Sequence, residues 1–180
     1  MPDITIYKEG KCMTDILKAD ITDCEMLLIG IGDEWKCNAQ TDSEKIIDIY
    51  NMLNDYLGKK NYFIVTSCDD GLIYKSNLNK KRITAPFFEQ EKGEEQWNFY
   101  NRWLQSTLNH RLLLLELGEG FASPNFMRWP FENITFINNK AKLYRVHAKL
   151  PNIADNIRDK AVSVKENSVE FLKKMLENAD

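Results

Sequence analysis

The sequence predicts an α/β fold: a three-layer, Rossmann-like domain built on a doubly wound, mainly parallel sheet. Two apolar runs of strand length, Met26–Ile31 and Leu112–Leu117, each lead into a Gly-x-Gly turn. The first run has no polar alternation, which is typical of a strand buried on both faces of a parallel sheet. Segments with the period of a helix alternate with strand-like runs along the chain, and this favours a sheet covered by helices on both faces.

The first half of the chain is expected to alternate between helices and strands. Cys12–Ala19 has helical spacing and leads through a turn over Asp20–Asp23 into the first strand. A loop is expected over residues 33–42. Ser43 can then cap a helix that stops at Gly58, since glycine is common just after a helix C-terminus. Further strands are expected at residues 62–65, 82–84, 142–146 and 161–164, the last at an edge of the sheet.

Three longer helices are expected in the second half. Glu94–Leu108 carries aromatic and leucine side chains on one face. Pro124 suits the first position of a helix through Phe131, which Pro130 would kink or restart. Asn167 can cap the last helix, because a glutamate follows three residues later. Shorter helices are expected at residues 72–78 and 151–157, and an acidic surface loop around residues 89–96.

Composition indicates one globular domain of 180 residues, with 43% hydrophobic and 28% charged residues and a net charge of −3. We expect a lead-in over residues 1–25, a core over 26–165 and a C-terminal helix over 166–180. Neither nucleic acid nor a membrane is an expected partner, because basic residues are not in excess and the apolar runs fall short of the roughly 20 residues of a spanning helix. The beginning of the chain does not read as a signal peptide, so a cytoplasmic location is expected.

The four cysteines are expected to be thiols. Cys12, Cys24, Cys37 and Cys68 have no spacing typical of a zinc site, and no metal is expected. Buried structural thiols are the expectation for all but Cys68, which follows a predicted strand and is a candidate nucleophile.

Three segments at the ends of predicted strands indicate a ligand site: Gly30-Ile31-Gly32, Thr66–Asp70 and Gly118–Ser123. In doubly wound sheets, ligands bind at the carboxyl ends of the strands, where the strand order reverses. Glycines at this position allow the backbone to approach a pyrophosphate. We therefore expect the two glycine turns to lie side by side and to open a gap of nucleotide size.

These segments resemble the sirtuins. The resemblance rests on the first Gly-x-Gly, on Thr66 and Asp70 as a Thr-x-x-x-Asp, and on the run from Leu115 to Glu132, which contains Glu-Leu-Gly-x-Gly-Phe and Met-Arg-Trp-Pro-Phe-Glu. The sequence is most similar to the divergent bacterial branch that includes macrodomain-linked sirtuins. The resemblance implies a Rossmann-like domain with NAD in a cleft, and NAD-dependent deacylase or ADP-ribosyltransferase chemistry.

The departures from the sirtuin pattern concern catalysis and zinc. Cys68 stands where the family has an asparagine near the nicotinamide ribose, and Thr84–Phe87 stands where it has its catalytic histidine. An imidazole base for deacylation is therefore missing at the matching position. Phe87–Gln96 replaces the zinc module with a link that lacks cysteine and histidine, so the small zinc domain is expected to be absent. His147 matches the family's late adenosine-side asparagine.

The candidate site residues follow from the strand ends and from the resemblance. Cys68, Asp70 and Glu119 are the candidates for catalytic roles. The residues expected to bind NAD or ADP-ribose are Gly30, Gly32, Asp33, Glu34, Trp35, Thr66, Cys68, Asp70, Gly118, Gly120, Phe121, Ser123, Arg128 and His147.

Several candidates also have a structural explanation. Trp35 can stack on a flat ring or pack in the core. Arg128 can clamp a phosphate or carboxylate, or pair with Glu132 one turn later. His147 can reach a ligand or satisfy a backbone group. Asp70 can hold a ribose hydroxyl or form a turn.

Acidic residues surround the expected site. Asp33 and Glu34 disfavour a phosphate directly beside them, and they can instead accept ribose hydroxyls, bind a cationic group or cap a helix. Asp69 and Asp70 should raise the pKa of Cys68, whereas a nucleophilic thiol needs a lowered pKa.

We expect a degenerate Sir2-family protein that binds NAD or an ADP-ribose-type nucleotide without deacylating proteins. Two alternatives remain open. One is an active NAD-consuming enzyme, an ADP-ribosyltransferase or NAD glycohydrolase, in which Asp69, Asp70 or Glu119 stabilises a ribosyl cation. The other is an interaction protein with a vestigial cleft, acting on a protein partner or as a homo-oligomer.

Overall fold

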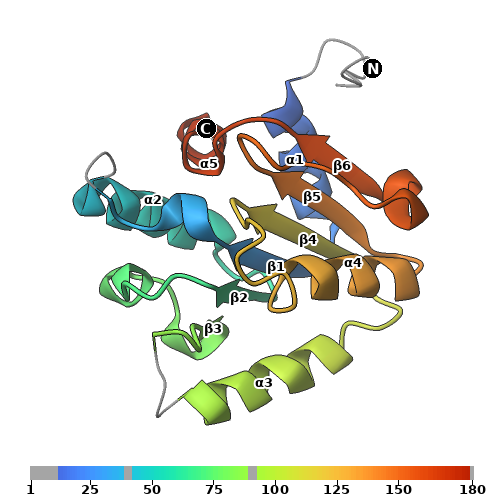
Figure 1. Ribbon diagram of the computed structural model, residues 1–180, viewed down its shortest axis with the longest axis horizontal. Helices are drawn as coiled ribbons and strands as arrows, with labels where there is room; N and C mark the ends of the chain where they lie inside the picture. Colours follow the sequence, from blue (N-terminus) through green and yellow to red (C-terminus); the bar gives the residue numbers. More distant parts are fainter. Residues whose placement is uncertain (1–11, 39–41, 89–92, 179–180) are drawn as a thin grey trace.

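A parallel β-sheet forms the centre of the computed structural model, which describes residues 12–38, 42–88 and 93–178. Its six strands lie in the order β3-β2-β1-β4-β5-β6 and all neighbours are parallel (Figure 1). This is the order of a doubly wound Rossmann sheet, which reverses between β1 and β4. The strands are β1 Met26–Ile31, β2 Tyr62–Thr66, β3 Ile83–Thr84, β4 Leu112–Leu117, β5 Lys142–Val146 and β6 Ala161–Val164.

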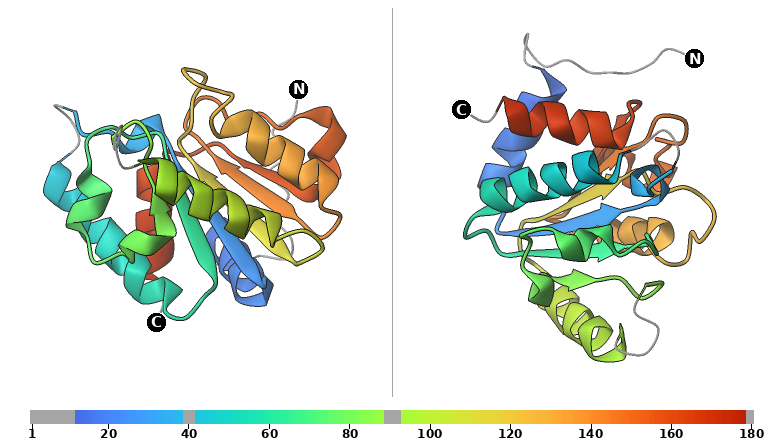
Figure 2. Two further views of the ribbon diagram at one scale, coloured as in Figure 1. Left: turned by 90° about the horizontal axis from the view of Figure 1, so that it is seen from below. Right: turned by 90° about the vertical axis from the view of Figure 1, so that its left-hand side faces the viewer.

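Helices cover both faces of the sheet, so the predicted three-layer α/β fold is confirmed (Figure 2). One face packs against α1, α2 and α5, and the other against α3 and α4. The helices are α1 Met13–Asp23, α2 Ser43–Leu57, α3 Gly93–Gln105, α4 Arg128–Ile137 and α5 Ser168–Glu177. Four 3-10 helices connect them: η1 Asp33–Trp35, η2 Leu72–Lys75, η3 Lys80–Arg82 and η4 Asp155–Lys160.

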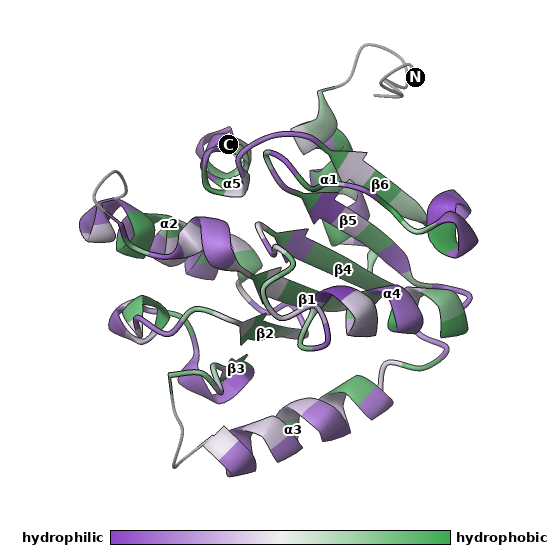
Figure 3. Cartoon of the chain, in the orientation of Figure 1, coloured by the Kyte–Doolittle hydropathy of each residue, from purple (hydrophilic) through white to green (hydrophobic). Residues whose placement is uncertain are grey.

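The register of the central strands fixes which side chains share a face. Leu28 of β1 lies beside Phe63 of β2 and Leu114 of β4, and all three point into the layer under α3 and α4. Every residue of β1, β2 and β4 is buried. Figure 3 shows the hydrophobic colour concentrated on these strands. Burial on both faces explains their apolar runs.

Two helix boundaries differ from the sequence prediction. α4 begins at Arg128 and not at Pro124, and Pro130 occupies its third position, where a missing N–H interrupts no helical hydrogen bond. α1 continues through Asp23, so the expected turn over Asp20–Asp23 is helical.

Smaller differences concern caps and loops. Asp42, and not Ser43, caps α2 by accepting a hydrogen bond from the Glu44 N–H. Part of the expected 33–42 loop is η1, the helix expected at 72–78 is the shorter η2, and that expected at 151–157 is η4. Asn167 caps α5 as predicted.

Parts of four predictions lie outside the described residues: residues 1–11 of the lead-in, 39–41 of the loop, 89–92 of the acidic segment and 179–180 of the C-terminal helix. The division into lead-in, core and C-terminal helix stays a prediction. Among the described helices, none has the length and apolarity needed to cross a membrane.

Candidate functional site

The two Gly-x-Gly turns lie side by side at the reversal of strand order. The Gly32 N–H donates to the Leu117 carbonyl at 2.9 Å, and the Glu34 N–H donates to the Gly118 carbonyl at 3.1 Å. The Gly118 N–H in turn donates to the Val146 carbonyl of β5 at 2.8 Å. The predicted adjacency of the turns is therefore confirmed, and they stand where doubly wound sheets bind ligands.

Each turn places a carboxylate-bearing residue on a glycine of the other turn. A Cβ atom added to Gly32 would lie 2.3 Å from Glu119 Cα and 2.3 Å from its Oε2. A Cβ on Gly118 would lie 2.6 Å from Glu34 Cβ, and one on Gly120 would lie 3.2 Å from Asp33 Oδ2. We call this reciprocal packing the acid–glycine interlock. The expected gap between the glycines is therefore not open in this structure, because the Glu119 backbone and the side chains of the acidic residues fill it.

Gly30 has a different role from the other glycines. Its hydrogen faces α4, where an added Cβ would lie 2.5 Å from Met127 Sδ and 2.8 Å from the Phe131 ring. The residue therefore permits close packing between β1 and α4. It belongs to the interior and does not face the turn around Glu119.

Glu119 is a buried carboxyl whose pKa is far from its ordinary value. The residue is 2% exposed, and its Oε2 accepts a hydrogen bond from the Ser67 hydroxyl at 2.6 Å. Burial raises the pKa of Glu119 to about 7, with the negative charge of Asp33 adding to the shift and the Ser67 hydrogen bond opposing it. A carboxyl group with this pKa can exchange protons near neutral pH.

Glu34 and His147 mainly satisfy backbone groups. The two Glu34 carboxylate oxygens accept hydrogen bonds from Ala148 N–H at 2.9 Å and from Ser168 N–H at 2.8 Å. His147 Nδ1 accepts the N–H groups of Lys149 at 3.0 Å and Leu150 at 3.1 Å, so the proton of the neutral ring is on Nε2.

The contact between these two side chains is consequently not a hydrogen bond. Glu34 Oε1 lies 3.4 Å from His147 Nδ1, which is already an acceptor. Burial lowers the pKa of His147, although the carboxylate of Glu34 opposes this shift. A neutral His147 that accepts backbone N–H groups agrees with the predicted alternative in which this residue satisfies a backbone group.

The turn after β2 holds Asp70 and Cys68. The Asp70 carboxylate accepts hydrogen bonds from the Cys37 N–H at 3.2 Å and the Leu72 N–H at 3.0 Å, which is the geometry of a turn-forming aspartate. Thr66 Oγ accepts the Cys68 N–H at 3.0 Å. Burial raises the pKa of Cys68 to about 12, with Asp70 adding to the shift, so the group is a protonated thiol at neutral pH.

The predicted aromatic candidates occupy very different environments. Trp35 is fully buried, stacks on Tyr50 with ring centroids 5.2 Å apart and donates its Nε1–H to Ser168 Oγ at 3.1 Å. It is a core residue in this structure. Phe121 is 54% exposed and covers the Arg128 guanidinium, whose central carbon lies 4.3 Å from the ring centroid. Phe121 is thus an aromatic side chain at the site that a ligand ring can contact.

Arg128 is tied to the loops and not to Glu132. Its guanidinium donates to the carbonyls of Glu119 at 3.0 Å and Leu150 at 2.8 Å, so it holds the second glycine turn against the loop after β5. Glu132 instead accepts a hydrogen bond from Arg145 at 2.6 Å. The predicted alternative of an Arg128–Glu132 pair is therefore wrong.

A buried ion network beneath the site was not predicted from the sequence. Arg145 on β5 makes two hydrogen bonds to Glu116 on β4, at 2.7 and 2.9 Å, and both residues are fully buried. The Arg128 guanidinium lies 3.6 Å from the Glu116 carboxylate, and Arg145 also pairs with Glu132. The network therefore consists of two acidic and two basic side chains. The signal was present: Glu116 on β4 and Arg145 on β5 are charged residues that the strand register makes neighbours.

The outer rim of the site carries one lysine among acids. Lys36 Nζ lies 3.3 Å from Asp33 and 3.8 Å from Asp69. Ser123 lies half-buried in the loop after β4, where its carbonyl accepts the Phe126 N–H at 3.0 Å. Within the described residues, no group of three or more His, Cys, Asp or Glu side chains is placed to hold a metal ion.

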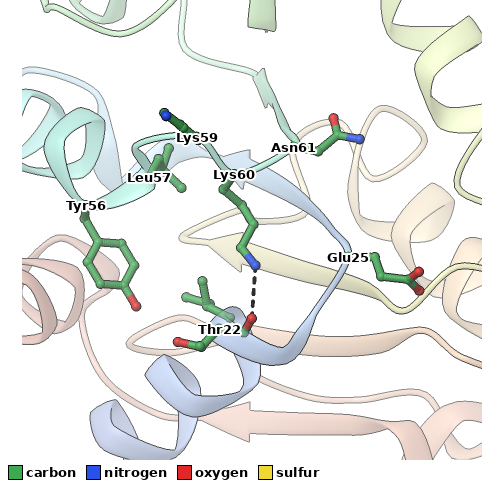
Figure 4. A pocket seen from close by; sticks show the side chains of 8 residues that line it. Thr22, Glu25, Tyr56, Leu57, Lys59, Lys60 and Asn61 are labelled. Atoms are coloured by element: carbon green, nitrogen blue, oxygen red, sulfur yellow. Dashed lines mark hydrogen bonds between the residues drawn. The ribbon is translucent and has the colours of Figure 1, made fainter.

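A separate cavity lies at the opposite end of the strands, near the amino ends of β1 and β2. It has a volume of about 560 Å³ and is lined by residues that precede β1 and β2, among them Glu25, Tyr56 and Lys59 (Figure 4). Lys60 spans its floor and donates to the carbonyls of Thr22 at 3.2 Å and Cys24 at 2.7 Å. Thr22 and Cys24 lie at the C-terminal end of α1, so the Lys60 ammonium group caps this helix within the cavity.

Comparison with known proteins places the fold. The chain matches no protein-family model. A solved structure described as "Structural Basis for the Mechanism and Regulation of Sir2 Enzymes" superposes with a TM-score of 0.56, covering 91% of this chain and 96% of that chain at 10% identity. The fold is Sir2-like. This Sir2-like domain carries its glycine turns at the switch point, but 10% identity extends the likeness to the fold alone.

The chain also has a distant relative among curated proteins. A protein ADP-ribosyltransferase of Staphylococcus aureus (strain Mu50) is 25% identical over 101 residues, which make up 56% of this chain. The match covers 32% of that relative's length.

Proposed function

We propose that this Sir2-like domain binds NAD or an ADP-ribose-type nucleotide at the carboxyl ends of β1, β2 and β4. The observation that carries the proposal is the pairing of two glycine turns at the switch point, with Phe121 exposed beside them. Both the Sir2-like fold and the S. aureus relative support this class of ligand. The same motifs and this relative support a place near the divergent bacterial branch of sirtuins.

The proposed domain does not deacylate proteins. Deacylation in the Sir2 pattern needs an imidazole base, and the matching segment, Thr84–Phe87, contains no histidine. Among the described residues at this edge, His147 offers an imidazole, but backbone N–H groups occupy its Nδ1. NAD-dependent conversion of an acetyl-lysine peptide to the unacetylated peptide, at a rate above the no-enzyme control, would contradict this part of the proposal.

Calorimetry with two matched variants tests binding. ADP-ribose and NAD should each release heat on mixing with the protein at millimolar ligand. Phe121→Ala should weaken binding about tenfold by removing an aromatic contact. Phe136→Ala is the control: Phe136 is also 54% exposed, but it lies near the C-terminal end of α4, at the opposite edge. Equal effects of the two substitutions on affinity would contradict a nucleotide site at the carboxyl ends of the strands.

ADP-ribosyl transfer or NAD hydrolysis is the second candidate function, favoured by the S. aureus relative. Loss of nicotinamide leaves positive charge on the ribose, which a carboxylate near the sugar stabilises. Glu119 and Asp70 supply carboxylates at this edge, whereas Cys68 is a protonated thiol. Nicotinamide release from NAD, measured for the wild type, Asp70→Asn, Glu119→Gln and the control Asp155→Asn, tests these roles. Asp70→Asn and Glu119→Gln should slow the release, and Asp155→Asn should not. Release that all three variants leave unchanged would reject these roles.

A further inference from the structure

We propose that protonation of His147 releases the loop after β5, residues 147–152, and so makes nucleotide binding at the carboxyl ends of the strands sensitive to pH. We call the hydrogen-bonded turn around His147 Nδ1 the histidine latch. The inference rests on the proposed function and deepens it, because it assigns regulation by pH to the same site.

A few polar side chains hold this loop in place. The loop contains neither helix nor strand. The Ala148 N–H donates to the Glu34 carboxylate at 2.9 Å. The Arg128 guanidinium donates to the carbonyls of Leu150 at 2.8 Å and Asn152 at 3.3 Å. The conformation of the loop therefore depends on individual side-chain contacts, and the loss of one can open it.

His147 Nδ1 is the acceptor that fixes the beginning of the loop. It accepts the N–H groups of Lys149 at 3.0 Å and Leu150 at 3.1 Å. A proton on Nδ1 turns this atom into a donor, so both N–H groups lose their acceptor in one step. An N–H group without an acceptor is stable only in contact with water, and the loop must open toward solvent to provide it.

The protonated ring has a new partner within reach. Glu34 Oε1 lies 3.4 Å from His147 Nδ1, where two acceptors face each other while the ring is neutral. A proton on Nδ1 makes this contact a charge-assisted hydrogen bond. The same Glu34 oxygen accepts the Ala148 N–H, so the new bond competes with a further contact of the loop.

Arg128 connects the histidine latch to the nucleotide site. Its Nη2 donates to the Leu150 carbonyl, and its Nη1 donates at 3.0 Å to the Glu119 carbonyl in the second glycine turn. Phe121 covers the same guanidinium, with the central carbon 4.3 Å from the ring centroid. Release of Leu150 therefore removes a support of Arg128 and of the aromatic side chain that we expect to contact the ligand.

The charged groups around His147 determine where the latch responds. Glu34 and Asp33 from η1 favour the protonated ring, whereas Arg128 from α4 and Lys149 from the loop disfavour it. Burial is the largest influence, so the pKa of His147 lies below its ordinary value of 6.5. The released loop binds the proton more tightly than the latched one, and the latched form therefore loses stability as the pH falls below 6.5.

Amide hydrogen exchange of the ligand-free protein, followed by NMR at pH 7.5 and pH 5, tests the latch. The protection factors of the Lys149 and Leu150 amides should fall at least about tenfold between these pH values, while the His147 ring signals titrate. His147→Asn supplies an acceptor that does not titrate, because asparagine accepts the N–H two residues later, and its protection should change less than about twofold. His147→Phe removes the acceptor and should give low protection at both pH values.

His110→Asn is the matched control. It removes the other histidine of the chain, whose ring lies 3.5 Å from Glu25 before β1. The loop amides should keep their response to pH in this variant. Thermal melts of each variant at both pH values verify that it is folded before the exchange is measured.

Calorimetry with ADP-ribose extends the test to the nucleotide site. Because Glu119 also titrates in this range, affinities are compared between variants at the same pH. At pH 7.5 the wild type and His147→Asn should bind alike. At pH 5 the wild type and His110→Asn should bind at least about fivefold more weakly than His147→Asn.

The outcomes separate the histidine latch from the proposed function. A His147 ring that titrates while the Lys149 and Leu150 amides keep their protection would overturn the latch. A ring that stays neutral down to pH 5, or an equal loss of protection in His147→Asn, would also overturn it. Equal affinities of the wild type and His147→Asn at pH 5 would overturn its control of nucleotide binding. Silence from every variant at millimolar ADP-ribose would reject the proposed function, and the exchange data would then decide the latch alone.

Discussion

At the scale of single residues, the two most informative side chains are buried groups with raised pKa values. Glu119 and Cys68 both lie against Gly32: Glu119 packs on its Cα, and the Cys68 thiol donates to its carbonyl at 3.4 Å. Burial disfavours the charged form of each, which leaves Cys68 a neutral thiol and makes Glu119 a group that titrates near neutrality. Their chemistry is thus determined by packing around one glycine.

Glu119→Gln should stabilise the protein at high pH. The folded-state pKa of Glu119, about 7, lies above the ordinary value of 4.5 for a glutamate. The folded state therefore binds the proton more tightly, and wild-type stability falls as pH rises from 4.5 through 7. The variant lacks this loss, so at pH 8 its free energy of unfolding should exceed that of the wild type by up to about 3 kcal/mol. Urea unfolding at pH 5 and pH 8 measures this.

The control for this prediction is Asp69→Asn, at an exposed carboxylate beside the same site. Its effect should differ little between the two pH values. A stability gain for Glu119→Gln that is the same at pH 5 and pH 8 would show that the carboxyl titrates normally in the folded protein.

Alkylation should distinguish the four cysteines. Cys12 and Cys37 are exposed, whereas Cys24 and Cys68 are buried with raised pKa values. In folded protein at pH 7.5, iodoacetamide should modify the first two and spare the second two, since the thiolate is the reactive form. Peptide mass mapping provides the readout, and urea-unfolded protein is the control. Rapid labelling of Cys68 in the folded protein would contradict its assigned environment.

At the scale of elements, the acid–glycine interlock should make the two glycine turns unequal. Gly32→Ala places a methyl group against backbone atoms of Glu119, at 2.3 and 2.6 Å, and should cost about 3 kcal/mol of unfolding free energy. Gly120→Ala meets the end of the Asp33 side chain at 3.2 Å, which can move, and should cost below about 1 kcal/mol.

Thermal or urea unfolding of these two variants measures the difference. They change the same position of the two Gly-x-Gly motifs, and neither glycine has a left-handed φ, so backbone strain contributes to neither. Equal destabilisation would show that the turns are not packed against each other as described.

The pairing of β4 with β5 depends on the buried ion network. Arg145→Met leaves the Glu116 carboxylate buried without its two strongest hydrogen bonds and should destabilise the protein by about 3–5 kcal/mol. Adding Glu116→Gln should recover part of this loss, because the uncompensated charge is then gone. Lys45→Ala is the control: it breaks an exposed pair with Glu170 and should cost below about 1 kcal/mol. Urea unfolding measures all three.

The sequence predicted elements best where burial determines the pattern. The apolar runs of β1, β2 and β4 identified these strands and their parallel arrangement, because parallel strands buried on both faces need such runs. The start of α4 was wrong because Pro124 suits a first helical position, yet the chain stays irregular until Arg128. Proline preference is local, whereas the helix start is fixed by tertiary contacts.

The sequence predicted where the candidate site lies, but it did not predict which groups its side chains contact. The strand ends that meet were predictable from topology. That Glu119 would lie on Gly32, or that Arg128 would bind loop carbonyls, depends on side-chain directions within turns that spacing does not encode. Glu116 and Arg145 interrupt apolar strands and were detectable as a charged pair only once the β4–β5 register was known.

At the scale of the whole molecule, stability should fall from the centre of the sheet to its edges. β1 and β4 have partners on both sides and are buried throughout, whereas β3 has two residues and β6 lies at an edge. Amide hydrogen exchange followed by mass spectrometry should be slowest in peptides from Met26–Ile31 and Leu112–Leu117, and faster in Ala161–Val164. Slower exchange in β6 than in β1 would contradict this ranking.

The strand order also has a consequence for the growing polypeptide on the ribosome. β1 can pair with β2 early, but its other edge waits for β4, which is made only when synthesis reaches Leu112. Until then the nascent chain presents the unpaired amide groups of an apolar strand, a template for aggregation. Translation that stalls before this point should therefore leave a product that depends on chaperones.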